Sequence, residues 1–192
     1  MILIHKNKFI IFLSAILLIT SIGCANRQMT GESLLLDDFN DAIDPNELGG
    51  FSYIYAHKGA RIEAGYHLLE SDESSLYNYC LEISWQTPIA SDAGWGFNTR
   101  VLDVTIANYL KLSLKPKSDI NGVQLAIKDM NGKEVKQPLS RYAKNDRDWL
   151  NVVIPLSDYK GLDFTRIKAI TLIFSPHTPE GSLLIDDIEF RK

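Results

Sequence analysis

Cysteine is scarce in this chain, whose 192 residues include only two, Cys24 and Cys80. A fold held together by disulfides needs a larger set of paired cysteines, so the sequence excludes a disulfide scaffold. Cys80 lies in the segment "YNYCLEISW" (77–85), which contains no histidine to activate a thiol. We therefore expect Cys80 to be a small buried hydrophobic residue.

An excess of positive charge is also missing. Lysine and arginine number 20 against 24 aspartates and glutamates, which gives a formal net charge of −4. Proteins that bind nucleic acid through its phosphates need a basic patch or stripe, and the basic residues here are scattered. We predict no nucleic-acid partner.

Catalytic motifs are absent as well. The sequence has no serine nucleophile elbow, no H-E-x-x-H zinc motif and no glycine-rich loop that would bind phosphates. Its four histidines are too dispersed to form a zinc site. Carboxylates are plentiful, so a glycosidase pair is compatible with the composition, but no motif points to one. We predict that the chain is not an enzyme.

Long hydrophobic runs are limited to one, "FIIFLSAILLITSIG" (9–23), which follows Lys6 and Lys8. At about 15 residues it is too short for a stable membrane span, but it fits the apolar region of a secretory signal peptide. It ends in "SIGC", which resembles a bacterial lipobox, although Ser21 stands where leucine is usual. The alternative is an uncleaved N-terminal anchor.

This N-terminal pattern predicts a lipoprotein signal peptide over residues 1–23, a lipidated Cys24, a polar tether over 24–33 and a single domain over 34–192. With either a lipid or an uncleaved anchor, the domain would lie outside the cytoplasm and be tied to a membrane. The expected location is the bacterial cell envelope.

Helical periodicity is absent from the rest of the chain, and an alternation of apolar and polar residues dominates. Such alternation is typical of strands with one face on a core. The segment "DMNGKE" (129–134) contains Asn131-Gly132, a strong hairpin signal. The expected strands cover residues 77–85, 109–115, 123–129, 150–156 and 169–174. We predict an all-β fold, an antiparallel β-sandwich.

Five segments together carry a family resemblance. They read "DDFND…NELGGF", "GWGFNTRVLDVTIANYLKLSLKPKS", "VQLAIKDMNGKE", "DWLNVVIPLSDYKGLDFTRIKAITLIF" and "GSLLIDDIEF". The combination resembles galactose-binding-like jelly rolls and is most similar to carbohydrate-binding modules of the family-11 kind and related bacterial lipoproteins. The resemblance implies a glycan bound on a concave sheet face and a structural calcium ion near the chain termini.

Two matching acidic pairs suggest where such an ion would bind. In "LLLDDFN" (34–40) and "LLIDDIEF" (183–190), strict alternation turns Asp38 and Asp186 toward the apolar side. A buried carboxylate is costly unless it is paired or bound to metal, and calcium prefers oxygen ligands. We predict a Ca²⁺ site from Asp38, Asn40 and Asp186, to which Glu47 adds a further oxygen. The alternative is that each aspartate accepts local backbone hydrogen bonds.

Sugar binding requires exposed aromatic rings beside fixed polar side chains. We predict Trp95, in the glycine-flanked "AGWGF", as the first aromatic platform and Tyr142 as the second, whereas Trp85 and Trp149 are expected in the core. The predicted polar lining is Lys111, Gln124 and Lys128, with Arg141 and His177 as further candidates. The alternative for each is an ordinary solvated surface.

The predicted function is non-catalytic binding of a polysaccharide or other glycan by an exported, lipid-anchored domain. The alternative is a structural or protein-interaction lipoprotein that uses the same fold and binds no sugar.

Overall fold

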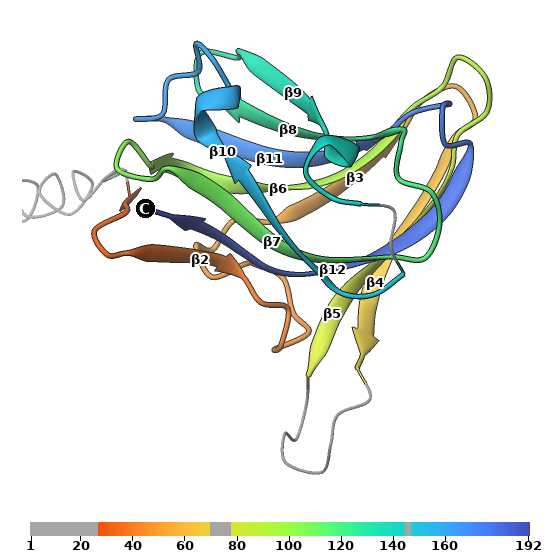
Figure 1. Ribbon diagram of the computed structural model, residues 1–192, viewed down its shortest axis with the longest axis horizontal. Coiled ribbons are helices and arrows are strands. Elements are labelled where there is room, and N and C mark those ends of the chain that lie inside the picture. The colour runs from red at the N-terminus through yellow and green to blue at the C-terminus, as the bar shows by residue number, and fades with distance from the viewer. Residues whose placement is uncertain (1–26, 70–77, 145–146) are drawn as a thin grey trace, which may run out of the picture.

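Two six-stranded sheets pack face to face in the computed structural model, which describes residues 27–69, 78–144 and 147–192 (Figure 1). Within these ranges all strand pairs are antiparallel except β1 with β6. Sheet A contains β1 (Arg27–Gln28), β3 (Ser52–Ala56), β6 (Ala93–Asp103), β8 (Val123–Asp129), β9 (Glu134–Pro138) and β11 (Ile167–Phe174). Sheet B contains β2 (Ser33–Asp37), β4 (Arg61–Leu68), β5 (Tyr79–Gln86), β7 (Tyr109–Pro116), β10 (Leu150–Pro155) and β12 (Glu180–Arg191).

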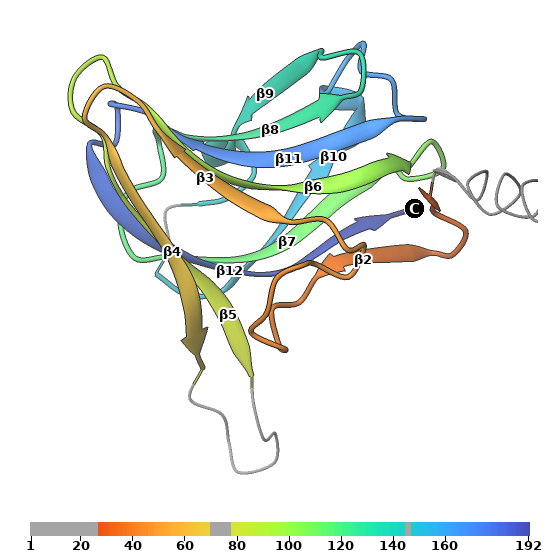
Figure 2. The ribbon, with the colours of Figure 1, turned by 180° about the vertical axis from the view of Figure 1, so that it is seen from behind.

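The order of the strands differs from their order in the sequence. Sheet A runs β1-β6-β11-β8-β9, and β3 pairs with β6 beside β1. Sheet B runs β10-β7-β12-β5-β4, and β2 pairs with β12. The view from behind shows β3 along the edge of sheet A beside β6 (Figure 2). This arrangement confirms the predicted antiparallel β-sandwich of jelly-roll type.

The core forms between the sheets from alternate residues of each strand. In β7 the leucines at 110, 112 and 114 are fully buried, and the residues between them point outward. In β8 the buried residues at 123, 125 and 127 alternate with the outward-pointing Gln124, Ala126 and Lys128. Each fully buried apolar side chain of this size stabilises the fold by about 1.5–3 kcal/mol relative to exposure.

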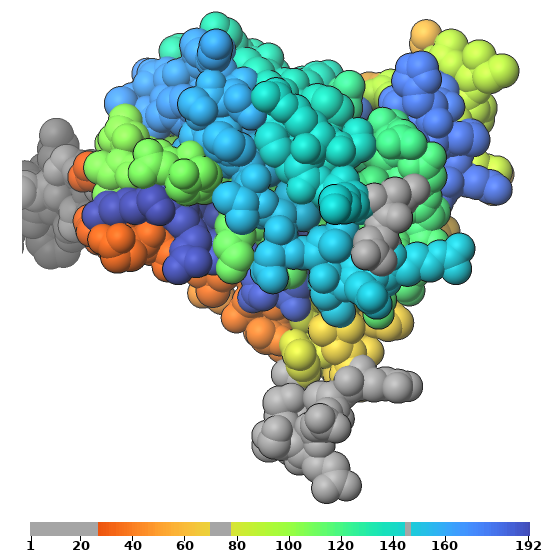
Figure 3. All heavy atoms as spheres, in the orientation of Figure 1, coloured from red at the N-terminus to blue at the C-terminus, as the bar shows by residue number. Residues whose placement is uncertain are grey.

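Two short 3₁₀ helices lie along one side of the sandwich. The first, η1 (Leu139–Arg141), follows β9 of sheet A, and the second, η2 (Leu156–Asp158), follows β10 of sheet B. In the space-filling view the cyan and light-blue residues around them cover the front of the molecule (Figure 3). They close the side of the core at the connection from one sheet to the other.

The two ends of the domain meet in sheet B, as the matching acidic pairs suggested. Strand β2 pairs with β12, and Asp37 lies opposite Ile188. Part of the predicted tether belongs to the fold, because Arg27 and Gln28 pair with β6 and Met29 is only 1% exposed.

The predicted signal peptide and Cys24 lie outside the described residues. Within the described ranges, no helix is long and apolar enough to cross a membrane.

Candidate functional site

The outer face of sheet A carries small residues at its centre and aromatic residues at one edge. Strand alternation turns Tyr53 and Tyr55 of β3 outward, opposite Gly96 and Gly94 of β6. Farther across the sheet the outward residues are Ala169, Thr171 and Ile173 of β11 and Gln124, Ala126 and Lys128 of β8. This surface is called the tyrosine face below.

The two tyrosine rings lie over the glycines of the neighbouring strand. A Cβ atom at position 94 would lie 2.6 Å from Tyr55 Cζ, and one at position 96 would lie 2.9 Å from Tyr53 Oη. Glycine is therefore required at both places for the rings to rest on the sheet, an arrangement known for aromatic–glycine cross-strand pairs. Both tyrosines stay half-buried, so part of each ring faces solvent.

Hydrogen bonding and burial hold these rings in place. Tyr53 Oη and Thr171 Oγ1 share a 2.6 Å hydrogen bond. Burial, followed by the charge of Asp92, raises the pKa of Tyr55 to about 12, and burial also raises the pKa of Tyr53. The ring of Tyr55 lies 5.0 Å from that of His57, between centroids. Both phenols thus remain protonated at neutral pH and present hydroxyl groups on a fixed aromatic surface.

The opposite edge of the tyrosine face is charged. Glu134 and Lys136 of β9 form a 3.1 Å ion pair. The negative charge of Glu134 contributes to the raised pKa of both Tyr53 and Tyr55, although three strands lie between β9 and β3. Between the two edges the centre of the face is buried, with Ala126 1% and Thr171 7% exposed.

The predicted polar lining divides between the two sheets. Gln124 and Lys128 lie on the tyrosine face, as outward residues of β8. Lys111 lies on the outer face of sheet B, where its Nζ is 3.2 Å from Glu189 Oε1. The structure thus contradicts a single lining that contains all three residues.

Trp95 was wrongly predicted as an exposed platform. Its side chain is only 4% exposed and packs between the sheets, where its ring centroid lies 6.1 Å from that of Phe39 and 5.6 Å from that of Phe97. The flanking glycines belong to a regular strand and supply its outward positions, which leaves Trp95 on the inward face.

Trp85 is buried as expected, whereas Trp149 is 37% exposed and not a core residue. Tyr142 lies after η1, at the side of the sandwich and away from the sheet centres. Its hydroxyl donates a 2.6 Å hydrogen bond to Asp158 Oδ2, and Arg141 lies 5.4 Å from its ring centroid. Tyr142 is thus engaged in an internal contact.

The acidic pairs are neighbours, but Asp186 does not point into the core. Asp187 has a φ of 49°, and the register of β12 shifts at this point. This bulge reverses the alternation, so that Ile185 and Ile188 both face inward while Asp186 lies on the outer face of sheet B. Strict alternation therefore gave the wrong side for Asp186.

Burial and mutual repulsion act on two of these carboxyl groups. Burial, then the charge of Asp187, raises the pKa of Asp186 to about 7. The charges of Asp38 and Asp37 add to this effect. Burial likewise raises the pKa of Asp37 to about 7, and Asp41 is among the charges that add to it.

The geometry of the predicted calcium ligands matches local hydrogen bonding. Asp38 Oδ1 accepts the backbone N–H of Asn40 at 3.2 Å, and Asp186 Oδ1 accepts the backbone N–H of Asp187 at 2.9 Å. Across residues 27–69, 78–144 and 147–192, no group of three or more histidine, cysteine, aspartate or glutamate side chains is placed to hold a metal ion. Amide and backbone carbonyl oxygens would therefore have to supply part of a calcium site at these aspartates.

Sequence reasoning did not select Tyr53 and Tyr55 as ligand residues. The signal was present in two short patterns, because "YIY" and "GWG" each place matching residues at alternate positions. Pairing between β3 and β6 is what brings the tyrosines of the first pattern over the glycines of the second.

This antiparallel β-sandwich has the fold of solved carbohydrate-binding modules. A family model described as "Carbohydrate binding domain 30" matches residues 47–192, and the chain belongs to this family. Among curated proteins, none matches this chain.

Solved structures of low sequence identity share the fold. A family 11 carbohydrate-binding module of the cellulosomal cellulase Lic26A-Cel5E of Clostridium thermocellum superposes with a TM-score of 0.62 at 16% identity, covering 85% of this chain and 96% of that one. A family 11 module from the same organism, in complex with a β-1,3-1,4-mixed-linked tetrasaccharide, gives 0.61 at 17% identity, with coverage of 85% and 97%. The family 30 module of its cellulase Cel9D-Cel44B gives 0.52 at 19% identity, with coverage of 69% and 91%.

Proposed function

We propose that this chain is an exported, lipid-anchored module that binds a polysaccharide on its tyrosine face without catalysis. The observation that supports the face is the placement of Tyr53 and Tyr55 over Gly96 and Gly94. The expected location is the bacterial cell envelope, which rests on the N-terminal sequence pattern.

The chemistry of the tyrosine face suits a sugar chain. Sugar rings have apolar C–H faces that pack on aromatic rings, and their hydroxyl groups exchange hydrogen bonds with polar side chains. On this face the tyrosine rings supply the apolar contact, and Gln124 and Lys128 are outward polar groups on a neighbouring part of the same sheet. The centre of the face is buried, with Ala126 1% and Thr171 7% exposed, so a bound chain would lie on the tyrosine rings and on the outward side chains around them.

Binding to a soluble mixed-linkage β-glucan tests this proposal. The full chain, in a detergent without a sugar headgroup, would be titrated by calorimetry beside Tyr53→Ala and Tyr55→Ala. Loss of an aromatic contact of about 1.4 kcal/mol weakens affinity about tenfold. Tyr66→Ala is the matched control, since Tyr66 lies on β4 of the other sheet and is 38% exposed.

Equal loss of affinity in the Tyr66→Ala variant would count against the tyrosine face. If the intact chain binds no polysaccharide from a panel of plant, fungal and bacterial glycans, the chain acts instead through protein contacts.

A further inference from the structure

A pocket at one end of the sandwich is separate from the tyrosine face. It has a volume of about 340 Å³ and opens where the β6–β7 loop meets the β10–η2 turn. The space-filling view shows these two segments, green and light blue, against each other at the left (Figure 3). The lining residues are Val104, Thr105, Ala107, Asn108, Tyr109, Pro155, Leu156, Ser157 and Phe164.

Backbone hydrogen bonds connect the walls of this end pocket. The N–H of Leu156 donates to the carbonyl of Asn108 at 2.9 Å, and the N–H of Val104 donates to the carbonyl of Phe164 at 2.9 Å. Tyr109 and Pro155 are directly paired across β7 and β10. These links join the β6–β7 loop to the β10–η2 turn and to Phe164, so the fold itself holds these walls together, as in small-molecule sites that are largely preformed.

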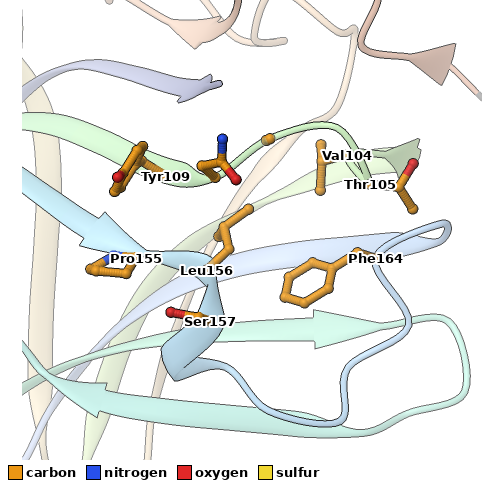
Figure 4. A pocket seen from close by; sticks show the side chains of 9 residues that line it. Val104, Thr105, Tyr109, Pro155, Leu156, Ser157 and Phe164 are labelled. Atoms are coloured by element: carbon orange, nitrogen blue, oxygen red, sulfur yellow. The ribbon is translucent and has the colours of Figure 1, made fainter.

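The end pocket has an apolar floor and a polar rim. In the close-up, Leu156 points toward the β6–β7 loop that carries Val104, and the ring of Phe164 points toward Leu156 (Figure 4). Tyr109 is 40% exposed and adds an aromatic ring at the rim. Asn108 and Ser157 are also exposed there and offer an amide and a hydroxyl group.

None of the nine lining residues is charged. An anion or a cation would therefore gain no ion pair, whereas a neutral polyol would find both an apolar surface and uncharged hydrogen-bonding groups. The volume is at the lower end of the range of about 300–1,000 Å³ for small-molecule sites, which suits one sugar ring better than a chain.

We propose that the end pocket is a second carbohydrate site, which takes a single terminal residue of a neutral glycan. The choice of ligand class rests on the proposed function, but the residues and the location are independent of it. A module with both sites would hold a polysaccharide along the tyrosine face and a chain end at the end pocket.

Nuclear magnetic resonance titration of the ¹⁵N-labelled full chain tests the second site. The probes are glucose, galactose, mannose and a β-1,3-1,4-linked glucan tetrasaccharide, with glucuronate as the charged comparison. At least one neutral probe should shift the amide signals of Thr105, Asn108 and Ser157 in a saturable way. A site with a Kd of about 1 mM is nearly saturated at about 20 mM. Glucuronate should shift them less at equal concentration.

Variants separate the two sites. Asn108→Ala should weaken the response at the end pocket about three- to tenfold, the loss expected for one hydrogen bond. Ser157→Phe, which fills the pocket from its exposed rim, should abolish it. Asn151→Ala is the matched control, because Asn151 is exposed on β10 outside the pocket. Tyr53→Ala should leave the response of the end pocket unchanged.

Four results would overturn the second site. The first is that no neutral probe shifts the three amide signals in a saturable way at concentrations up to about 20 mM. The second and third are that the response persists in Ser157→Phe or is lost in Tyr53→Ala. The fourth is that glucuronate gives a stronger response than the neutral probes. If the pocket amides respond while signals of Tyr53 and Tyr55 do not, the second site stands and the proposed role of the tyrosine face fails.

Discussion

Tyr53 of β3 reaches over β6 and shares a 2.6 Å hydrogen bond with Thr171 of β11. The residue of β6 that lies between them is Gly96, which pairs with both. A side chain there would block the contact, so a glycine on one strand determines how an aromatic ring from the next strand lies on the sheet. Ring orientation and sugar affinity should therefore depend on a residue that does not itself contact the ligand.

Gly96→Ala should weaken polysaccharide binding. The added Cβ would lie 2.5 Å from the backbone carbonyl oxygen of Ile170, 2.8 Å from Thr171 Oγ1 and 2.9 Å from Tyr53 Oη, so the Tyr53 ring and the neighbouring strand β11 would both have to shift. We expect about a tenfold loss of affinity by calorimetry, together with about 1–3 kcal/mol of destabilisation from overpacking. Gly65→Ala on β4 is the control, since a Cβ added there would meet no atom within 4 Å. If Gly96→Ala binds with unchanged affinity, the position of the Tyr53 ring over Gly96 does not contribute to binding.

The two tryptophans whose places were exchanged in the sequence-based prediction should differ in stability. Trp95→Ala empties a site that is 4% exposed, which should cost about 3–5 kcal/mol in the free energy of unfolding. Trp149 is 37% exposed, and Trp149→Ala should cost less than about 1 kcal/mol. Urea denaturation followed by circular dichroism measures both. A cost at Trp149 as large as that at Trp95 would contradict the observed packing.

The fold was predictable because strands such as β7, β8 and β10 keep an alternating pattern, and that pattern indicates which of their residues face a core. Which outward residues share a surface was not predictable, since it depends on strand order. Lys111 and Gln124 belong to β7 and β8, which follow each other in the sequence, yet the connection between them crosses from sheet B to sheet A.

Local irregularity accounts for the error at Asp186. A single bulged residue, Asp187, reverses the side on which each later residue of β12 lies. The segment "LLIDDIEF" does not indicate that reversal, because a regular strand and a bulged strand would both bury most of its apolar residues. The glycines around Trp95 suggested an exposed aromatic platform, although they fill outward positions of strand β6.

Anchoring provides a test of the N-terminal prediction. Cys24→Ser should release the chain from the membrane fraction or stop its maturation, because a lipidated cysteine would be the anchor. Cys80→Ala is the matched control, since Cys80 is fully buried in the domain. Membrane fractionation and intact mass measurement are the readouts. Unchanged mass and membrane retention in Cys24→Ser would contradict the lipobox.

Stability in the presence of chelator should fall as pH rises from about 4 to 8. The pKa values of Asp37 and Asp186 are both raised to about 7 in the folded chain from an ordinary value of 3.8. A carboxyl group with a raised folded pKa stabilises the fold fully below its unfolded pKa, and this contribution is lost as pH passes through the folded pKa. Melting curves at pH 5 and pH 8 measure the loss, and Asp186→Asn should reduce it. A pH-independent Tm would show that these carboxyl groups are well solvated.

Calcium bound to the same carboxyl groups would oppose this loss of stability at high pH. At pH 8 the ionised Asp37 and Asp186 repel each other and their acidic neighbours, and a bound cation would relieve that repulsion. For a site with a Kd of ~50 μM, calcium at about 5 mM is present at roughly 100 times the Kd. Calcium at this concentration should stabilise the fold by about 2.7 kcal/mol at pH 8 and by much less at pH 5.

Two aspartate variants locate the calcium effect. Asp186→Asn should abolish the increase in Tm that calcium gives at pH 8, because it removes a charge from the acidic cluster. Asp119→Asn should retain the increase, since Asp119 lies between β7 and β8, where its Oδ1 accepts the backbone N–H of Asn121 at 2.9 Å. A Tm at pH 8 that is the same in calcium and in chelator would mean that the acidic pairs are hydrogen-bonded strand ends and nothing more.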